Sequence, residues 1–309
     1  MDDINLQIIK KRLFELANNY KNYTYCIPSI WLNYKEKENS IIKINPIEYF
    51  ILKINQIYDI HSNNRFDNFK VSQSVIYNFI PRLFTSFDHN GDGKIESACD
   101  KTSFRETGTF LKTITVLPYI KMMGINTIHI LPIFEIGKAH KRGNLGSIYA
   151  IKNIYKFDEN LSEPVLQLTI EQEFAALVEA AHLLGIKIVL EFIFRTASLD
   201  SDLIPEHPDW FYWIYSKNND KILLPPKFSK RIYNQILEKM NVDDFSNLPE
   251  PSRKYINHFS QTPISISLND GEYIGMTSDS KTVRIPNGFS DWPPNDAQPI
   301  WRDVTYLKL

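Results

Sequence analysis

A short polar segment, residues 88–96, carries the sharpest chemical pattern in this sequence and reads DHNGDGKIE. Its oxygen-bearing side chains fall at alternate positions, and two glycines allow the backbone to fold around a central point. Hard cations such as Ca²⁺ need oxygen ligands in that kind of arrangement. Acidic side chains so close together also repel one another unless a cation compensates them. The pattern predicts a site for Ca²⁺, or alternatively Mg²⁺, whose ligands are the side chains of Asp88, Asn90, Asp92 and Glu96 and the carbonyl of Lys94.

An EF-hand loop is one alternative for this segment, because its ligands have a similar spacing. The twelfth position of such a loop should be a bidentate Glu, and here it is Cys99. Residues 76–84, which precede the loop, have the β-branched and aromatic composition of a strand rather than of an entering helix. An EF-hand-like calcium sensor is therefore disfavoured, while a polar turn that binds no ion stays open as the simpler alternative.

Three apolar segments of strand type must position this loop. They cover residues 76–81, 125–132 and 186–194, and stretches with helical features separate them. Apolar strands that alternate with helices are typical of βαβ units around a parallel sheet. The predicted fold class is α/β.

Local signals place two helices between the strands. Pro118 breaks the apolar stretch that follows Thr109, so the first helix is expected to restart at this proline and to run over 118–123, with Gly124 as its left-handed cap. Thr169 and Gln172 form a capping-box pair, which predicts a second helix that ends at Gly185. Both helices would return the chain to the sheet through short loops.

Composition excludes several classes of protein. The chain has 309 residues, 35 Lys+Arg against 36 Asp+Glu and a net charge of −1, so it offers no polycationic surface for nucleic acid. The chain has only two cysteines, Cys26 and Cys99, which are too few for a disulfide framework to stabilise a fold of this size. The first residues lack the features of a signal peptide, and no apolar run reaches the roughly 20 residues of a membrane span. The sequence thus predicts a cytoplasmic protein that binds neither nucleic acid nor membrane.

Taken together, these motifs resemble the α-amylase family, glycoside hydrolase family 13. Residues 76–82 leading into 88–96 are similar to the family's first strand and metal loop, residues 117–133 to its first helix and second strand, and residues 173–190 to its second helix and third strand. The resemblance implies a TIM-type (β/α)₈ barrel that acts on α-glucans or related α-glucosides.

The resemblance also points to individual residues that would bind substrate. Tyr149 falls near the family's tyrosine that stacks on sugar, although a structural role fits it equally well. Where the family has Asp and then Asn-His after the third strand, this chain has Glu191 and then Arg195-Thr196. Arg195 can order a carboxylate in the site as a substrate-binding residue, but a structural ion pair with Glu191 or Asp200 is the more economical interpretation.

Residues 205–211 resemble a segment of amylase-family glucan maltosyltransferases, which places the chain in a divergent subfamily. The aromatic residues at 210–213 that follow have two interpretations. Their rings suit the apolar faces of pyranose sugars, but they are equally suited to a hydrophobic core. The core is the favoured interpretation.

The resemblance divides the chain into three parts. The first, 1–70, is a helical extension with helices expected over 6–17 and 46–60. The second and third are the first three β/α units of the barrel at 71–196 and a loop-rich, domain B-like insertion at 197–309, whose last residues, 303–309, are expected to form a helix leading toward a missing fourth strand.

The family's catalytic acids have no counterpart in the pattern. Retaining glycosidases need a nucleophile and an acid/base, and neither family context is found after residue 194. A barrel also needs eight strands, of which three are predicted. The chain is expected to be an inactive N-terminal part of a longer hydrolase or glucan transferase, or to be completed by a second chain. The alternative is a non-catalytic amylase-like protein that binds carbohydrate or a partner.

Overall fold

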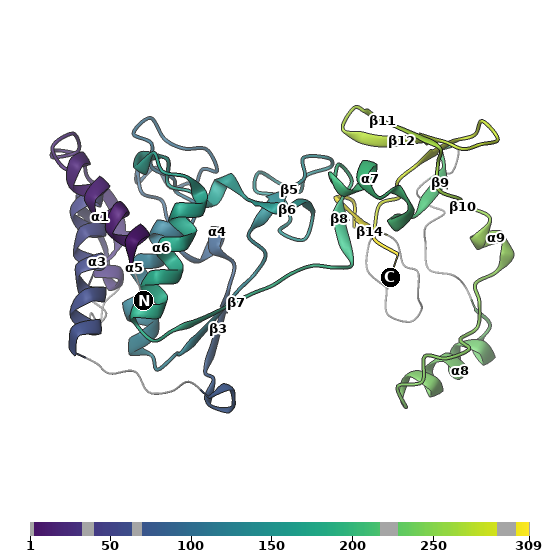
Figure 1. Cartoon of the computed structure of the whole chain (residues 1–309), viewed down its shortest axis with the longest axis horizontal. Coiled ribbons are helices and arrows are strands. Elements are labelled where there is room, and N and C mark those ends of the chain that lie inside the picture. Colours follow the sequence, from purple (N-terminus) through teal and green to yellow (C-terminus); the bar gives the residue numbers. More distant parts are fainter. Residues whose placement is uncertain (1–2, 33–39, 64–69, 217–227, 289–300, 309) are drawn as a thin grey trace. The chain divides into compact units, whose positions relative to one another are not determined.

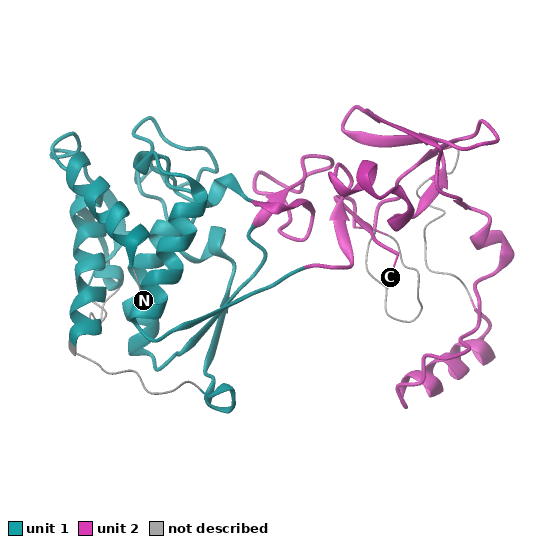
Figure 2. Ribbon diagram, in the orientation of Figure 1, with its two compact units in different colours: residues 1–133, 157–192 teal, residues 134–156, 193–309 magenta. Residues whose placement is uncertain are grey.

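The structure is a computed structural model that describes residues 3–32, 40–63, 70–216, 228–288 and 301–308. Its contacts divide the chain into two compact units (Figure 2). Unit 1 comprises residues 1–133 and 157–192, and unit 2 comprises residues 134–156 and 193–309. This grouping differs from the predicted segments, because the N-terminal helices belong to the same unit as the first strands. The three-part division by sequence stays a prediction.

Unit 1 is built on a parallel sheet of three strands in the order β3-β4-β7 (Figure 1). The strands are β3 (Ile76–Phe79), β4 (Thr127–Ile130) and β7 (Lys187–Leu190). Their register aligns Asn78 with His129 and His129 with Val189. The prediction of three parallel strands that alternate with helices is confirmed, and it is the part of a barrel-type α/β fold that the structure contains.

Four helices of unit 1 pack against one another, and one of them, α6, also contacts the strand β7 (Figure 1). The helix α5 begins after Thr109, whose side chain accepts a hydrogen bond from the N–H of Lys112, and α6 begins with the predicted capping box of Thr169 and Gln172. Each cap satisfies an N–H group that has no partner within the helix. The helices are α1 (Ile4–Leu16), α3 (Pro46–Asn63), α5 (Phe110–Met122) and α6 (Ile170–Leu183).

The prediction that the first helix starts at Pro118 is wrong, because α5 runs from Phe110 through this proline. A proline inside a helix removes one backbone hydrogen bond. Here the residues from 110 to 118 are all buried, and tertiary packing outweighs that loss. Gly124 follows the C-terminal end of α5 and has a φ of +82°, which is the left-handed conformation that the sequence predicted for it.

The N-terminal extension contains the two predicted helices and a hairpin that the sequence did not predict. Helices α1 and α3 confirm the prediction, while β1 (Tyr25–Pro28) and β2 (Ile41–Ile44) pair antiparallel between them. Helix α1 packs against α6, and α3 packs against α5. Two short helices complete unit 1: α2 (Ser29–Leu32) and α4 (Pro81–Phe84).

Unit 2 contains a five-stranded antiparallel sheet in the order β10-β9-β13-β12-β11. The sequence reads as loop here because the strands are short and their turns are rich in Asn, Asp and Gly, as in the β11–β12 turn, where Asp270 and Gly271 both have positive φ. The strands are β9 (Trp213–Tyr215), β10 (Phe259–Ser260), β11 (Ser265–Asn269), β12 (Glu272–Met276) and β13 (Thr282–Arg284).

The helix expected over 303–309 is a second wrong prediction. Val304–Tyr306 forms the strand β14, which pairs antiparallel with β8 (Thr196–Ser198). Two buried β-branched residues, Val304 and Thr305, favour this extended conformation. The remaining elements of unit 2 are β5 (Phe134–Ile136), β6 (Ile151–Phe157, whose last residue belongs to unit 1), α7 (Leu203–Glu206), α8 (Lys230–Met240) and α9 (Arg253–Ile256).

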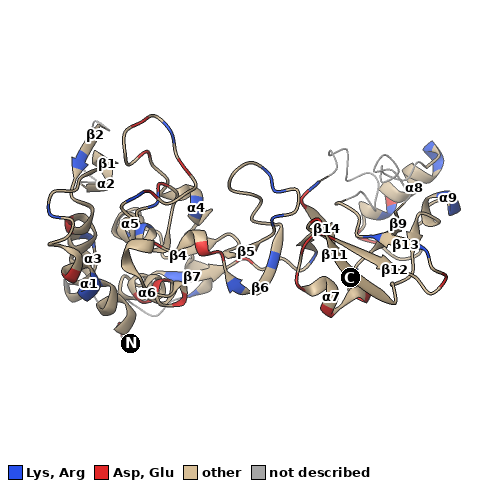
Figure 3. Cartoon of the chain, turned by 90° about the horizontal axis from the view of Figure 1, so that it is seen from above, with Lys and Arg blue, Asp and Glu red and all other residues tan. Residues whose placement is uncertain are grey.

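Acidic and basic residues are interspersed along the chain in both units (Figure 3). This distribution agrees with the near-neutral composition. Among the residues that the structure describes, no helix is both long enough and apolar enough to cross a membrane.

Candidate functional site

A polar cluster lies on the parallel sheet of unit 1, close to the carboxyl ends of its strands. Asn78 on β3 donates through Nδ2 to Nδ1 of His129 on β4, at 2.7 Å. With Nδ1 accepting, a neutral imidazole carries its proton on Nε2, and this atom lies 3.9 Å from Oε2 of Glu191, just after β7. The three side chains are partly exposed. Ligands of parallel α/β sheets bind at this end of the strands, so the cluster is a candidate site for polar groups of a substrate.

The loop at 88–96 is closed by hydrogen bonds to its own backbone. Both carboxylate oxygens of Asp88 accept N–H groups, Oδ1 from Gly91 at 2.7 Å and Asp92 at 3.1 Å, and Oδ2 from Gly93 at 2.7 Å. Oδ1 of Asn90 accepts from Asp92, and Oδ1 of Asp92 accepts from Lys94. The two glycines have φ of +79° and +85°, a region that glycine adopts without strain.

Two neighbouring elements hold this loop in place. Glu106, which is buried, accepts the N–H of Asn90 at 3.3 Å and that of Glu96 at 2.8 Å. His89 and Cys26 exchange hydrogen bonds of 2.8 Å, one between backbones and one from the imidazole Nδ1 to the carbonyl of Cys26. Burial lowers the pKa of His89 to about 3, so this imidazole is neutral. The N-terminal hairpin thus supports the loop, although no chemical role was expected of it.

The oxygen atoms of the loop are of the kind that a hard cation binds. Their arrangement matches a metal site only in part. Carboxylate and amide oxygens are the ligands Ca²⁺ prefers, and Asn90 Nδ2 lies 3.3 Å from Asp92 Oδ2 beside Asp88. Within the described residues, however, no three His, Cys, Asp or Glu side chains converge as metal ligands do. Hydrogen bonds link Asp88, Asn90 and Asp92 within the loop, and the five-ligand set with Lys94 and Glu96 stays a prediction.

Unit 1 also contains a cluster of buried ionisable side chains. Glu163, fully buried, accepts from the N–H of Arg105 at 2.7 Å and the hydroxyl of Thr109 at 2.8 Å, and its Oε2 lies 3.9 Å from Nζ of Lys112. The N–H of Glu163 donates to both carboxyl oxygens of Glu173, at 3.1 and 2.9 Å. Burial raises the pKa of Glu163 and lowers that of Lys112, and it raises the pKa of Glu173 to about 9. Glu173 is therefore protonated at neutral pH.

The two predicted substrate-binding residues lie in unit 2. The carbonyl of Tyr149 accepts from the hydroxyl of Thr196 at 3.0 Å, and the Tyr149 ring lies 6.0 Å from that of Trp301. Arg195 Cζ lies 5.0 Å from the ring centroid of Tyr306. The backbone of Arg195 accepts from the N–H of Leu307 at 2.8 Å. Tyr149 and Arg195 are thus linked through adjacent residues, and their contact with substrate stays a prediction.

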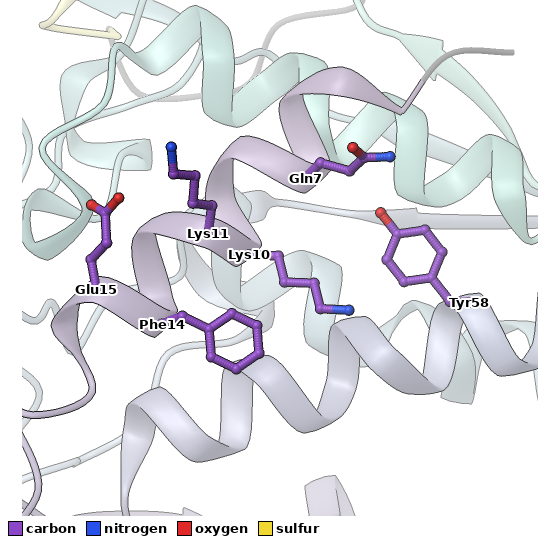
Figure 4. A pocket seen from close by; sticks show the side chains of 6 residues that line it. All are labelled: Gln7, Lys10, Lys11, Phe14, Glu15 and Tyr58. Carbon is purple, nitrogen blue, oxygen red and sulfur yellow. The ribbon is translucent and has the colours of Figure 1, made fainter.

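A shallow surface depression of about 520 Å³ lies between α1 and α3 (Figure 4). None of its lining residues was predicted to do chemistry. Nζ of Lys10 lies 5.1 Å from the ring centroid of Tyr58, and Phe14 is exposed beside it. The depression does not overlap the residues of the strand-end cluster or of the loop.

The parallel sheet, whose strands alternate with helices, defines the class as an α/β protein. The sequence model of the family described as "Alpha amylase, catalytic domain" matches residues 79–237, which is half of the chain. This match begins in β3 and includes β4 and β7. The chain belongs to the α-amylase family.

Named relatives match smaller parts of the chain. An alpha-1,4-glucan:maltose-1-phosphate maltosyltransferase of Cereibacter sphaeroides is 34% identical over 117 residues, covering 34% of this chain and 17% of that enzyme. The enzyme of the same name from Mycolicibacterium smegmatis is 29% identical over 174 residues, covering 51% of this chain and 22% of its own length. The chain thus spans about a fifth of the length of these two relatives.

Solved structures of amylases also match. An alpha-amylase from Lactobacillus plantarum is 30% identical, with a TM-score of 0.35 over 45% of this chain and 27% of that one. A maltogenic alpha-amylase from Thermotoga neapolitana is 23% identical, with a TM-score of 0.36 over 57% of this chain and 38% of that one. The family assignment rests on the sequence match at 79–237.

Sequence reasoning did not identify Asn78, His129 or Glu106 as site residues. His129 and Asn78 become neighbours only through the strand register. A polar residue in each of two successive apolar strands was the available signal. No local pattern marks Glu106, because its partners lie 10 and 16 residues away.

Proposed function

We propose that the protein acts on α-glucosidic carbohydrate as part of an α-glucan hydrolase or transferase. The family match over the three strands and the two helices that connect them carries this proposal. The polar cluster of Asn78, His129 and Glu191 supports it, because amide, imidazole and carboxylate groups bind sugar hydroxyls. The relatives named above are maltosyltransferases that use maltose 1-phosphate, so maltosyl transfer is the first reaction to test.

We propose further that this chain does not itself contain the nucleophile and the acid/base. A retaining mechanism needs two carboxyls about 5 to 5.5 Å apart. Of the cluster residues near the ends of β3, β4 and β7, Glu191 is an acid, while Asn78 and His129 are not. Within the described residues, β3 and β7 each have one neighbouring strand, and Ile76 and Val189 are 60% and 45% exposed. Further strands, from the same polypeptide or a second chain, would cover these residues and bring the acids.

The test combines binding with turnover. The purified chain is incubated with maltoheptaose, with and without maltose 1-phosphate, and chain lengths and released phosphate are followed by chromatography. We expect binding of maltoheptaose, measured by calorimetry, without any change in chain length. Turnover by this chain would overturn the placement of the acids elsewhere. Absence of binding would overturn the substrate class.

A non-catalytic, carbohydrate-binding relative is the second candidate. The residues Glu191, Arg195 and Thr196, which replace the family's Asp and Asn-His, favour it. The two candidates predict different results when the missing strands are supplied. An added polypeptide that contains the remaining family strands should restore turnover for an enzyme and not for a binding protein.

We also propose that the loop at 88–96 binds Ca²⁺, with Mg²⁺ as the alternative. The oxygen donors and the loop-closing hydrogen bonds of Asp88 support it. Calorimetric titration with each ion should show Ca²⁺ binding that Asp92→Ala abolishes and that Asp270→Ala, an exposed turn residue of unit 2, leaves unchanged. Equal titration curves for Asp92→Ala and the parent chain would contradict the site.

A further inference from the structure

The aromatic residues at 210–213 separate into a buried and an exposed set. Phe211 and Trp213 are fully buried in a hydrophobic cluster of unit 2, as the favoured interpretation of the sequence expected. Trp210 differs, because it is 43% exposed. Its ring lies parallel to the imidazole of His207, with centroids 3.9 Å apart and an angle of 9° between the planes. One face of the Trp210 indole is therefore covered, while much of the side chain is open to solvent.

The backbone around Trp210 is held by hydrogen bonds on both sides. The N–H of Trp210 donates to the carbonyl of His207 at 3.0 Å, and its carbonyl accepts from the N–H of Lys308 at 2.7 Å. The indole N–H of the buried Trp213 donates to the carbonyl of Pro208 at 2.8 Å. A ring held in this way loses little freedom when a ligand binds, and such preorganisation favours affinity.

Charged residues are neighbours of Trp210. Glu206 and Asp209 precede it in the sequence and are exposed, and Lys308, whose backbone N–H bonds the Trp210 carbonyl, is also exposed. The Asp209 carboxylate attracts the Lys308 ammonium. A flat apolar ring bordered by hydrogen-bonding groups matches the chemistry of a pyranose, which has an apolar C–H face and a rim of hydroxyls.

We propose that Trp210, backed by His207, is a stacking platform for a glucose unit of an α-glucan. This inference rests on the proposed function for its choice of ligand. A protein partner fits the surface less well, because stable protein interfaces bury about 800 Å² on each side, and the exposed neighbours Glu206 and Asp209 are charged. Hydroxyl groups of a sugar, in contrast, can use both carboxylates and the Lys308 ammonium as partners.

The experiment measures maltoheptaose binding by calorimetry for the whole chain and for three variants. Trp210→Ala removes the stacking face, and we expect about a tenfold loss of affinity, the upper range for one aromatic contact. Trp210→Phe keeps a smaller flat ring and should lose less. Tyr155→Ala, which removes an 82% exposed aromatic side chain elsewhere in unit 2, is the matched control and should bind like the parent chain.

The outcomes separate this inference from the proposed function. Glucan binding that is equal in the parent chain and in Trp210→Ala would overturn the platform and leave the substrate class standing. No binding by the parent chain would overturn both. Should Trp210→Ala fail to fold, hydrogen exchange of the parent chain decides: maltoheptaose should slow exchange at residues 207–212, and unchanged exchange there would count against the platform.

Discussion

The buried polar groups of the two units differ in how completely they are hydrogen-bonded. In unit 1 the carboxylate of Glu163 accepts two hydrogen bonds and faces Lys112, and Asp158 forms an ion pair of 3.3 Å with Arg82. In unit 2 Asp303 is 1% exposed and its Oδ1 forms an ion pair of 3.2 Å with Nε of the exposed Arg142, but neither carboxylate oxygen accepts a hydrogen bond.

The same difference holds beyond these residues. Within the described residues of unit 1, the buried side-chain atoms without partners are uncharged, whereas those of unit 2 include carboxylate oxygens of Asp200 and Asp303. A buried polar group without a partner costs free energy, and a carboxylate costs more than a hydroxyl. The comparison teaches that unit 1, which holds the family's strands and the loop, has a polar core that supports its geometry, while the polar core of unit 2 costs stability.

Glu163→Ala should have the largest effect. It removes the counter-charge that lies 3.9 Å from the buried ammonium of Lys112 and the acceptor of the Arg105 N–H, and removing one partner of a buried pair costs about 3–5 kcal/mol. Urea unfolding measures the change in the free energy of unfolding. Glu159→Ala, at an exposed position of the same segment, is the control and should change it by less than about 0.5 kcal/mol. Equal losses in both variants would mean that the buried cluster does not support unit 1.

Glu173→Gln tests the same cluster through pH. The pKa of Glu173 is raised from 4.5 to about 9 by burial. Between these values the unfolded chain releases a proton that the folded chain keeps, so this group's stabilising contribution is complete below about pH 4.5 and is lost as pH rises. The glutamine does not titrate and still offers an oxygen to the N–H of Glu163.

Urea unfolding of Glu173→Gln should therefore depend less on pH between 5 and 8 than that of the parent chain. At pH 8 the variant should be more stable by up to ~5 kcal/mol, since pH 8 lies 3.5 units above the unfolded pKa of 4.5 and one pKa unit corresponds to ~1.4 kcal/mol. Glu171→Gln, at an exposed position of the same helix, is the control and should follow the parent chain. A variant as sensitive to pH as the parent would show that Glu173 ionises normally.

The sequence predicted those features whose signals are local. The capping box of Thr169 and Gln172 spans four residues, and the loop at 88–96 carries its own donors and glycines, so both are readable without a fold. The strand β14 was mistaken for a helix because its partner, β8, lies about a hundred residues earlier. The predicted start of helix α5 was too late in the sequence, because only tertiary burial compensates for the hydrogen bond lost at Pro118.

The candidate site follows the same rule. The strands that carry Asn78, His129 and Glu191 were predicted, but the contact between these side chains depends on a register that only the folded sheet defines. The roles of Glu106 and Glu163 could not be predicted, because an acid reads as a surface residue until its buried partners are known.

Asp303→Asn should have the smallest effect and tests unit 2 directly. The substitution keeps the size of the side chain, removes a buried charge without hydrogen-bond partners, and loses only its pairing with the exposed Arg142. We expect a change in the free energy of unfolding within about 1 kcal/mol, of either sign, and unchanged hydrogen exchange at the paired amides of β8 and β14.

Asp158→Asn in unit 1 is the matched substitution. It leaves the buried guanidinium of Arg82 without its counter-charge, so it should cost about 3 kcal/mol. Urea unfolding of the two variants under the same conditions compares the units with one chemical change. If Asp303→Asn costs as much as Asp158→Asn, the Asp303 carboxylate has partners equivalent to those in unit 1, and the contrast between the two polar cores is wrong.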